Sequence, residues 1–256
     1  MNYVAGCVTD IGIKRKNNQD SFCYELAQYQ NDKIAYMVIC DGMGGFSKGE
    51  IASAEVLTTF GSWFRKRMPQ ILENGFSAEE LRQEWYSMAE SENLRISDYA
   101  AANHLKMGTT LTAALFLGEQ YYILHVGDCR LYEIREAEVV QLTHDHTVTQ
   151  REIDNGMISQ EEAENDSRQH ILLQCLGAGR EIVPDFVVGT IRLGTSYLLC
   201  SDGFRHKVSK TEMQKQLNAD NNPTKKIIEK NLADIIERIK NRGETDNITA
   251  GLLVVH

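Results

Sequence analysis

The chain has 256 residues, and its 42% hydrophobic and 25% charged residues are typical of a soluble globular protein with a sizeable core. Its 36 acidic and 27 basic residues give a formal charge of −9, which argues against a general nucleic-acid-binding protein. No apolar run approaches the roughly 20 residues that span a bilayer, there is no signal-peptide pattern, and the six cysteines lack zinc or CxxC spacing, so we expect a cytoplasmic protein with reduced thiols.

The chain begins with two predicted strands. Residues 3–10 alternate between apolar and polar side chains as a strand does, and a polar stretch over 14–20 interrupts the pattern. A second strand over 34–40 is apolar at nearly every position. Such a run predicts burial on both faces of a sheet.

Two long helices are predicted next. Apolar residues at helical spacing predict a helix over 51–68, whose basic end suits the helix dipole. Ser77 and Glu80 have the spacing of a capping box, which predicts a second helix that runs to about residue 105.

The second half of the chain is rich in strand-like segments. These are residues 109–117, 121–128, 130–136, 186–193, 196–202 and 247–255. Residues 144–180 between them are polar and helix-prone, and 225–240 form an amphipathic helix that Gly243 ends. Because strands follow one another through short turns, we expect an α+β fold with mixed or antiparallel sheets. No long linker divides the chain, so we expect one domain over 1–256.

Four aspartates stand at the ends of buried strands: Asp41, Asp128, Asp202 and Asp246. Each alone has an ordinary explanation, because Asp commonly ends strands and begins turns. Four with the same placement predict that the carboxylates meet at one edge of a sheet, where their repulsion would be relieved by cations. Ligation by oxygen alone favours Mg²⁺ or Mn²⁺ over zinc.

Two further features bear on this site. Gly42 lacks a Cβ, so its backbone carbonyl could approach an ion closely. The alternative is a phosphate-binding loop at the glycine-rich segment 41–49, but that segment matches neither established phosphate-loop pattern. Arg15 carries a planar fork suited to two phosphate oxygens. The alternative for Lys14, Arg15 and Lys16 is a solvated basic turn.

Seven segments of the chain, in this order, resemble the protein phosphatase 2C family in its compact bacterial form. They are TDIGIKRKNNQDSF, VICDGMGGFSKGE, MGTTLTAALF, HVGDCRLY, LTHDHTVTQREIDNGMISQEEAE, LLCSDGF and TDNITAGLLVV, and they extend from residue 9 to 255. The resemblance implies a four-layer αββα sandwich, in which two antiparallel sheets are flanked by helices and a metal site lies at one edge. It also implies that residues 144–180 form a flap beside that site.

The resemblance assigns roles to these residues. Asp41 would bridge two metal ions, Gly42 would supply a carbonyl oxygen to one of them, and the second would be bound by Asp202 and Asp246. Asp20 would act nearby through water, Asp128 would share a third, weaker ion with Asp202, and Arg15 would bind the substrate phosphate. A metal-bridging hydroxide would then attack phosphorus in line, with no covalent enzyme intermediate.

The chain departs from the family pattern at several positions. Gln19 stands where Glu is frequent, and Phe46 stands where bacterial relatives usually have His. Met43 replaces the His that serves as a general acid in animal relatives, so the leaving group must receive its proton elsewhere. Asp166 and Ser167 replace a His-Pro pair in the flap. His144 and His146 lie near the site in motif terms only and are interpreted as structural.

Three functions compete. The first is a Mg²⁺- or Mn²⁺-dependent phosphatase that acts on phosphoserine and phosphothreonine proteins. It would work opposite a cognate serine/threonine kinase, and we expect a cytoplasmic monomer that binds neither nucleic acid nor membrane. The second is a non-catalytic module that binds phosphoprotein, but the metal-binding aspartates of the pattern are all present. The third is another metal hydrolase such as a nuclease, against which the acidic charge argues.

Overall fold

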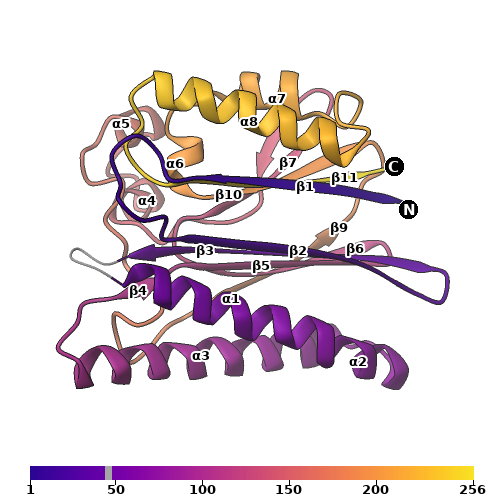
Figure 1. The fold of residues 1–256 in the computed structure, drawn as a ribbon, viewed down its shortest axis with the longest axis horizontal. Helices are drawn as coiled ribbons and strands as arrows, with labels where there is room; N and C mark the ends of the chain where they lie inside the picture. Colours follow the sequence, from indigo (N-terminus) through magenta and orange to yellow (C-terminus); the bar gives the residue numbers. More distant parts are fainter. Residues whose placement is uncertain (44–47) are drawn as a thin grey trace.

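A computed structural model describes residues 1–43 and 48–256 of the chain. Two antiparallel sheets pack face to face, and helices cover the outer face of each, so that four layers follow one another (Figure 1). The predicted αββα sandwich is confirmed. None of the helices in the described ranges is long and apolar enough to cross a membrane.

The first sheet has the strand order β1-β11-β10-β7-β8. Its strands are β1 (Tyr3–Asp10), β11 (Ile248–Val255), β10 (Thr195–Cys200), β7 (Arg130–Ile134) and β8 (Val139–Gln141). The second sheet has the order β2-β3-β5-β6-β9. Its strands are β2 (Asp20–Tyr29), β3 (Asp32–Met43), β5 (Leu111–Leu117), β6 (Gln120–Val126) and β9 (Asp185–Thr190), and the short β4 (Gly108–Thr109) pairs with β3.

Helices form both outer layers (Figure 1). The second sheet is covered by α1 (Gly49–Lys66), α2 (Met68–Asn74) and α3 (Ala78–Ala102), and the first by α7 (Lys210–Leu217) and α8 (Lys225–Asn241). Three short helices, α4 (Val148–Asp154), α5 (Gln160–Glu164) and α6 (Asp202–Arg205), lie together at one end of the sandwich.

The central strand β3 is buried on both faces, as its continuous apolar run predicts. Tyr36 and Val38 belong to the cluster under α1 and α3, whereas Met37 and Ile39 pack against the other sheet. Fully burying one such side chain contributes about 1.5–3 kcal/mol. The strand that leads to Asp41 is therefore held rigidly from both sides.

The strand β2 was not predicted, because the sequence placed the second strand at 34–40. Residues 20–29 form an edge strand in which no residue is fully buried, so they lack a continuous apolar run. A weak signal exists, since Phe22, Tyr24 and Leu26 place large apolar side chains at every second position. The missed strand matters because Asp20 is its first residue.

The two predicted helices differ slightly from their expected bounds. The first ends at Lys66, two residues early, and α2, which was not predicted, begins at Met68. Pro69 stands in the first turn of α2, where it cannot continue the hydrogen bonding of the preceding helix. The second ends at Ala102, three residues early. Ser77 caps it by accepting a 3.4 Å hydrogen bond from the backbone N–H of Glu80.

Candidate active site

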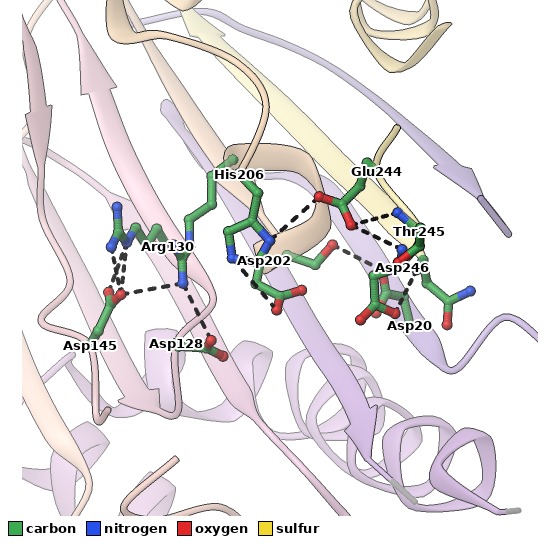
Figure 2. Close-up of polar contacts among 12 residues, drawn as sticks. Asp20, Asp128, Arg130, Asp145, Asp202, His206, Glu244, Thr245 and Asp246 are labelled. Carbon is green, nitrogen blue, oxygen red and sulfur yellow. Dashed lines mark hydrogen bonds and ion pairs between the residues drawn. The ribbon is translucent and has the colours of Figure 1, made fainter. Parts of the chain in front are cut away.

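Strand pairing brings the predicted acids to one edge of the sandwich (Figure 2). Asp20 and Asp41 are direct partners in the register of β2 and β3. In the other sheet Cys200 pairs with Ala250, so Asp202 after β10 lies near Asp246 before β11. Asp128, in the turn after β6, completes the group.

Burial and the neighbouring charges raise the pKa of Asp41 and of Asp20. Desolvation raises the pKa of Asp41 well above its usual value, and the charges of Asp20 and Asp202 raise it further. Desolvation, together with the charges of Asp202 and Asp246, raises the pKa of Asp20 to about 7, against the lowering effect of its hydrogen bonds. Such mutual repulsion is the condition that a bound cation relieves.

Unpartnered oxygen atoms give a second indication. Among the described residues, Asp20 Oδ1 and Asp202 Oδ1 are buried without a hydrogen-bond partner, whereas Asp20 Oδ2 accepts a 3.0 Å bond from Ser201 Oγ. A buried carboxylate oxygen without a partner is unfavourable, so a ligand is expected there. The donor set therefore fits hard divalent ions.

The carboxylates do not form a closed cage. Within residues 1–43 and 48–256, no three His, Cys, Asp or Glu side chains are arranged so that they could hold one metal ion. Mg²⁺ commonly keeps several waters and binds only one or two carboxylates. The arrangement fits ions that remain largely hydrated.

Gly42 has a steric reason to lack a side chain. A Cβ at this position would overlap the backbone carbonyl of Gly49 and lie 2.6 Å from the carbonyl oxygen of Gln19. The backbone N–H of Gly42 donates a 3.1 Å hydrogen bond to that same Gln19 carbonyl. Close packing of three backbone segments thus requires glycine here, independently of any metal ligation.

Arg15 lies at the same edge, in contact with a predicted metal ligand. Its Nη2 is 2.6 Å from Asp246 Oδ2, and its side chain is half exposed. The hydrogen bond to Asp246 raises the pKa of Arg15, and the charges of Asp246, Asp202 and Asp41 raise it further. The guanidinium is therefore directed at the acid cluster and remains open to solvent.

Asn247, which the sequence reading did not single out, positions the loop that carries Arg15. Its side chain accepts a 2.9 Å hydrogen bond from the backbone of Gln19 and donates to the carbonyls of Ile11 and Asn17 at 2.9 and 3.1 Å. The sequence signal that could have indicated Asn247 is its position next to Asp246 in the segment TDNITAG.

We expect Asn247→Ala to misplace Arg15 and to lower stability. The change removes the partner of the Gln19 backbone N–H and of the Ile11 and Asn17 carbonyls. A buried polar group left without a partner costs about 1–3 kcal/mol, and carbonyls that water can reach cost less. A raised KM for an aryl phosphate, with a lower Tm, is the expected result. Asn103→Ala, at the C-cap of α3, is the control. An unchanged KM would contradict the positioning role.

Asp128 belongs to a second group of charges with two arginines (Figure 2). Arg205 Nη2 lies 3.3 Å from Asp128 Oδ2 and 3.5 Å from Asp145 Oδ2, while Arg130 binds Asp145 with both ends of its fork at 2.7–3.0 Å. Burial and the charge of Asp202 raise the pKa of Asp128 to about 7, and Arg205 opposes that rise. The sequence reading named neither arginine.

His206 and Glu244 lie beside Asp202 and Asp246, and the sequence analysis did not name either of them. Glu244 accepts hydrogen bonds from the backbone N–H groups of Thr245 and Asp246 at 2.7 and 3.0 Å. His206 lies between Glu244 and Asp202, at 3.6 and 3.9 Å. Glu244 thus fixes the backbone that presents Asp246.

The segment 144–180 lies beside this edge. His146 Nδ1 accepts from the backbone of Gly127 and from Gln174, so Nε2 carries the proton and donates to Asp185 Oδ2 at 3.2 Å. His144 pairs with Asp154 at the surface. Both histidines thus have partners within the fold.

Asp166, which stands where the family pattern has another residue, is paired with an arginine. Arg168 pairs with Asp166 at 2.7 Å and with Glu152 of α4 at 2.8 Å, which ties this part of the segment to α4. Phe46, the departure in the glycine-rich segment, lies outside the described residues.

The comparisons with known proteins agree with this geometry. The model of the protein phosphatase 2C family matches residues 13–244. Protein phosphatase PhpP of Streptococcus pneumoniae is 32% identical over 249 residues, which cover 96% of this chain and 95% of PhpP.

Two solved structures are similar over their whole length. The serine/threonine phosphatase of S. agalactiae has a TM-score of 0.86 at 28% identity, with 100% of both chains covered. The catalytic domain of the serine/threonine protein phosphatase PstP, in complex with two manganese ions, has a TM-score of 0.76 at 28% identity, again with 100% of both covered. The fold is that of the metal-dependent serine/threonine phosphatases. The chain belongs to the protein phosphatase 2C family.

Proposed function

We propose that this chain is a Mg²⁺- or Mn²⁺-dependent phosphatase of phosphoserine and phosphothreonine proteins, with its active site at the acid-lined edge. The observation that carries the proposal is the meeting of Asp20, Asp41, Asp202 and Asp246 there, with unpartnered oxygens on Asp20 and Asp202. The manganese-bound PstP domain supports the choice of ion.

In this proposal the two ions would be held by Asp41, the Gly42 carbonyl, Asp202 and Asp246, and Asp20 would act nearby through water. Bound there, two divalent ions supply a hydroxide nucleophile near neutral pH and neutralise charge on the phosphoryl oxygens.

The other residues of the site bind the substrate phosphate or hold the site residues in place. Arg15 holds two phosphate oxygens with its fork, which fixes phosphorus relative to the acid cluster. Asn247 keeps the Arg15 loop in register, and Glu244 orients the backbone of Asp246. None of the six cysteines acts as a nucleophile, because the reaction needs no covalent intermediate.

We also propose a single catalytic domain over 1–256, with 144–180 as its flap, that acts as a cytoplasmic monomer. The pairing of β1 with β11 supports one domain, because it joins the first and last strands of the chain. Six unpaired cysteines fit a reducing compartment. The proposed substrates are phosphoproteins, including those of a cognate serine/threonine kinase, and neither nucleic acid nor membrane is a proposed partner.

The test is hydrolysis of an aryl phosphate and of a phosphothreonine peptide with Mn²⁺, with Mg²⁺ and with EDTA. Hydrolysis with either ion and none with EDTA is the expected result. Incubation with DNA and RNA tests the nuclease alternative, and cleavage of either would overturn the proposal. Metal binding without any hydrolysis would support a non-catalytic module instead.

Arg15→Ala is expected to raise KM for an aryl phosphate by roughly 10- to 100-fold with a smaller change in kcat, since a charge-assisted hydrogen bond contributes about 1.5–3 kcal/mol. Lys14→Ala and Lys16→Ala, at exposed neighbours of the same loop, are the controls. If all three variants behave alike, the loop is only a solvated basic turn.

A further inference from the structure

The short helix α6 carries a buried positive charge next to Asp128. The Arg205 side chain is 7% exposed, and its Nη2 lies 3.3 Å from Asp128 Oδ2, itself on a side chain that is 4% exposed. Asp202, at the start of the same helix, is three residues earlier and belongs to the acid cluster. A fixed cation of the protein thus borders the place where Asp128 and Asp202 would share an ion.

Asp128, Asp145, Arg130 and Arg205 form two ion pairs. Asp145 has its own counterion, because Arg130 binds it through both Nε and Nη2. Arg205 is therefore the cation available to Asp128, with a longer contact of 3.5 Å to Asp145. Two buried carboxylates face two arginines, as buried charges require.

A divalent ion at Asp128 would have to share this space with the guanidinium. Arginine stays charged at any working pH, so it cannot make room by losing its proton. Displacing it would leave a buried cation with weaker partners, which is unfavourable. The residues around Asp128 consequently do not fit a third metal ion.

We propose that Arg205 is an internal counterion that takes the place of a third divalent ion at Asp128, so that this phosphatase binds two ions. The inference rests on the proposed function, because it presupposes the two-ion site at Asp41, Asp202 and Asp246. It assigns to Arg205 the part of charge balance that would otherwise fall to a dissociable ion.

The test is the number of Mn²⁺ ions bound per chain at saturation, from equilibrium dialysis with electron paramagnetic resonance of the free ion. The measurement is made at pH 8 for every variant. The wild type, Asp128→Asn and Arg205→Met are compared. Arg242→Met removes an exposed arginine that pairs with Glu212 and serves as the matched control.

Two ions are expected for the wild type, for Asp128→Asn and for Arg242→Met. A third, weaker ion is expected in Arg205→Met, and it should be lost again when Asp128→Asn is added. Three ions in the wild type that fall to two in Asp128→Asn would overturn the inference and leave the proposed function standing. Two ions in folded Arg205→Met would also overturn it.

The comparison stays decisive if Arg205→Met fails to fold. The wild type and Asp128→Asn alone distinguish an equal count of two from a loss of one ion. Arg205→Lys, which keeps the charge, is expected to remain at two ions, and a gain of one would count against the counterion role. Failure of the wild type to bind any Mn²⁺ would overturn the proposed function together with this inference.

Discussion

Asp41→Asn is expected to lower kcat by roughly 10³-fold or more, a loss typical of removing one strong electrostatic contact from a transition state. The variant keeps the shape of the side chain but removes the charge that would contact both ions. Since Asp41 is repelled by Asp20 and Asp202, the ion-free variant should be at least as stable as the wild type. The measurements are steady-state kinetics and the rise in Tm on adding Mn²⁺, which should shrink in the variant.

Asp32→Asn is the matched control, because Asp32 lies exposed at the opposite end of the same strand. It should leave both the rate and the Mn²⁺-dependent Tm unchanged. Near-normal turnover in Asp41→Asn, or an undiminished response to Mn²⁺, would show that Asp41 is not a metal ligand.

Asp20→Asn is expected to stabilise the ion-free protein relative to the wild type, and increasingly so as the pH rises from 5 to 8. The pKa of Asp20 is about 7 in the folded protein against an ordinary value of 3.8. Between these values the folded protein holds a proton that the unfolded chain has released, so the wild type loses stability as the pH rises toward 7. The Asn variant has no such proton.

The expected difference at pH 8 is on the order of 4 kcal/mol, since the pKa rises from 3.8 to about 7 and one pKa unit corresponds to about 1.4 kcal/mol. Denaturant unfolding of both proteins in EDTA at pH 5 and pH 8 measures it. Burial lowers the pKa of His125 to about 4, which gives the opposite slope, but that contribution is common to both proteins and cancels. Millimolar Mn²⁺ should remove the wild type's disadvantage at pH 8. A difference that does not depend on pH would contradict the raised pKa.

From the sequence alone, the order of segments predicted an α+β fold, and the resemblance of seven ordered segments to a known family implied the sandwich. Continuous apolar segments such as 34–40 mark strands buried on both faces, and an acid at the end of such a strand is visible without coordinates. Asp41 and Asp202 could be proposed for this reason, since the feature that marks them is local. Edge strand β2 escaped because its partly exposed residues resemble a loop.

Only the tertiary structure decided which of these residues meet. The contact between Arg15 and Asp246 joins positions 231 apart in the chain, and that between Arg205 and Asp128 joins positions 77 apart. Such contacts depend on strand register and on where a four-residue helix turns, neither of which is encoded in a local pattern. The acids were therefore readable from the sequence, whereas their partners depend on antiparallel pairing, which brings distant segments to one edge.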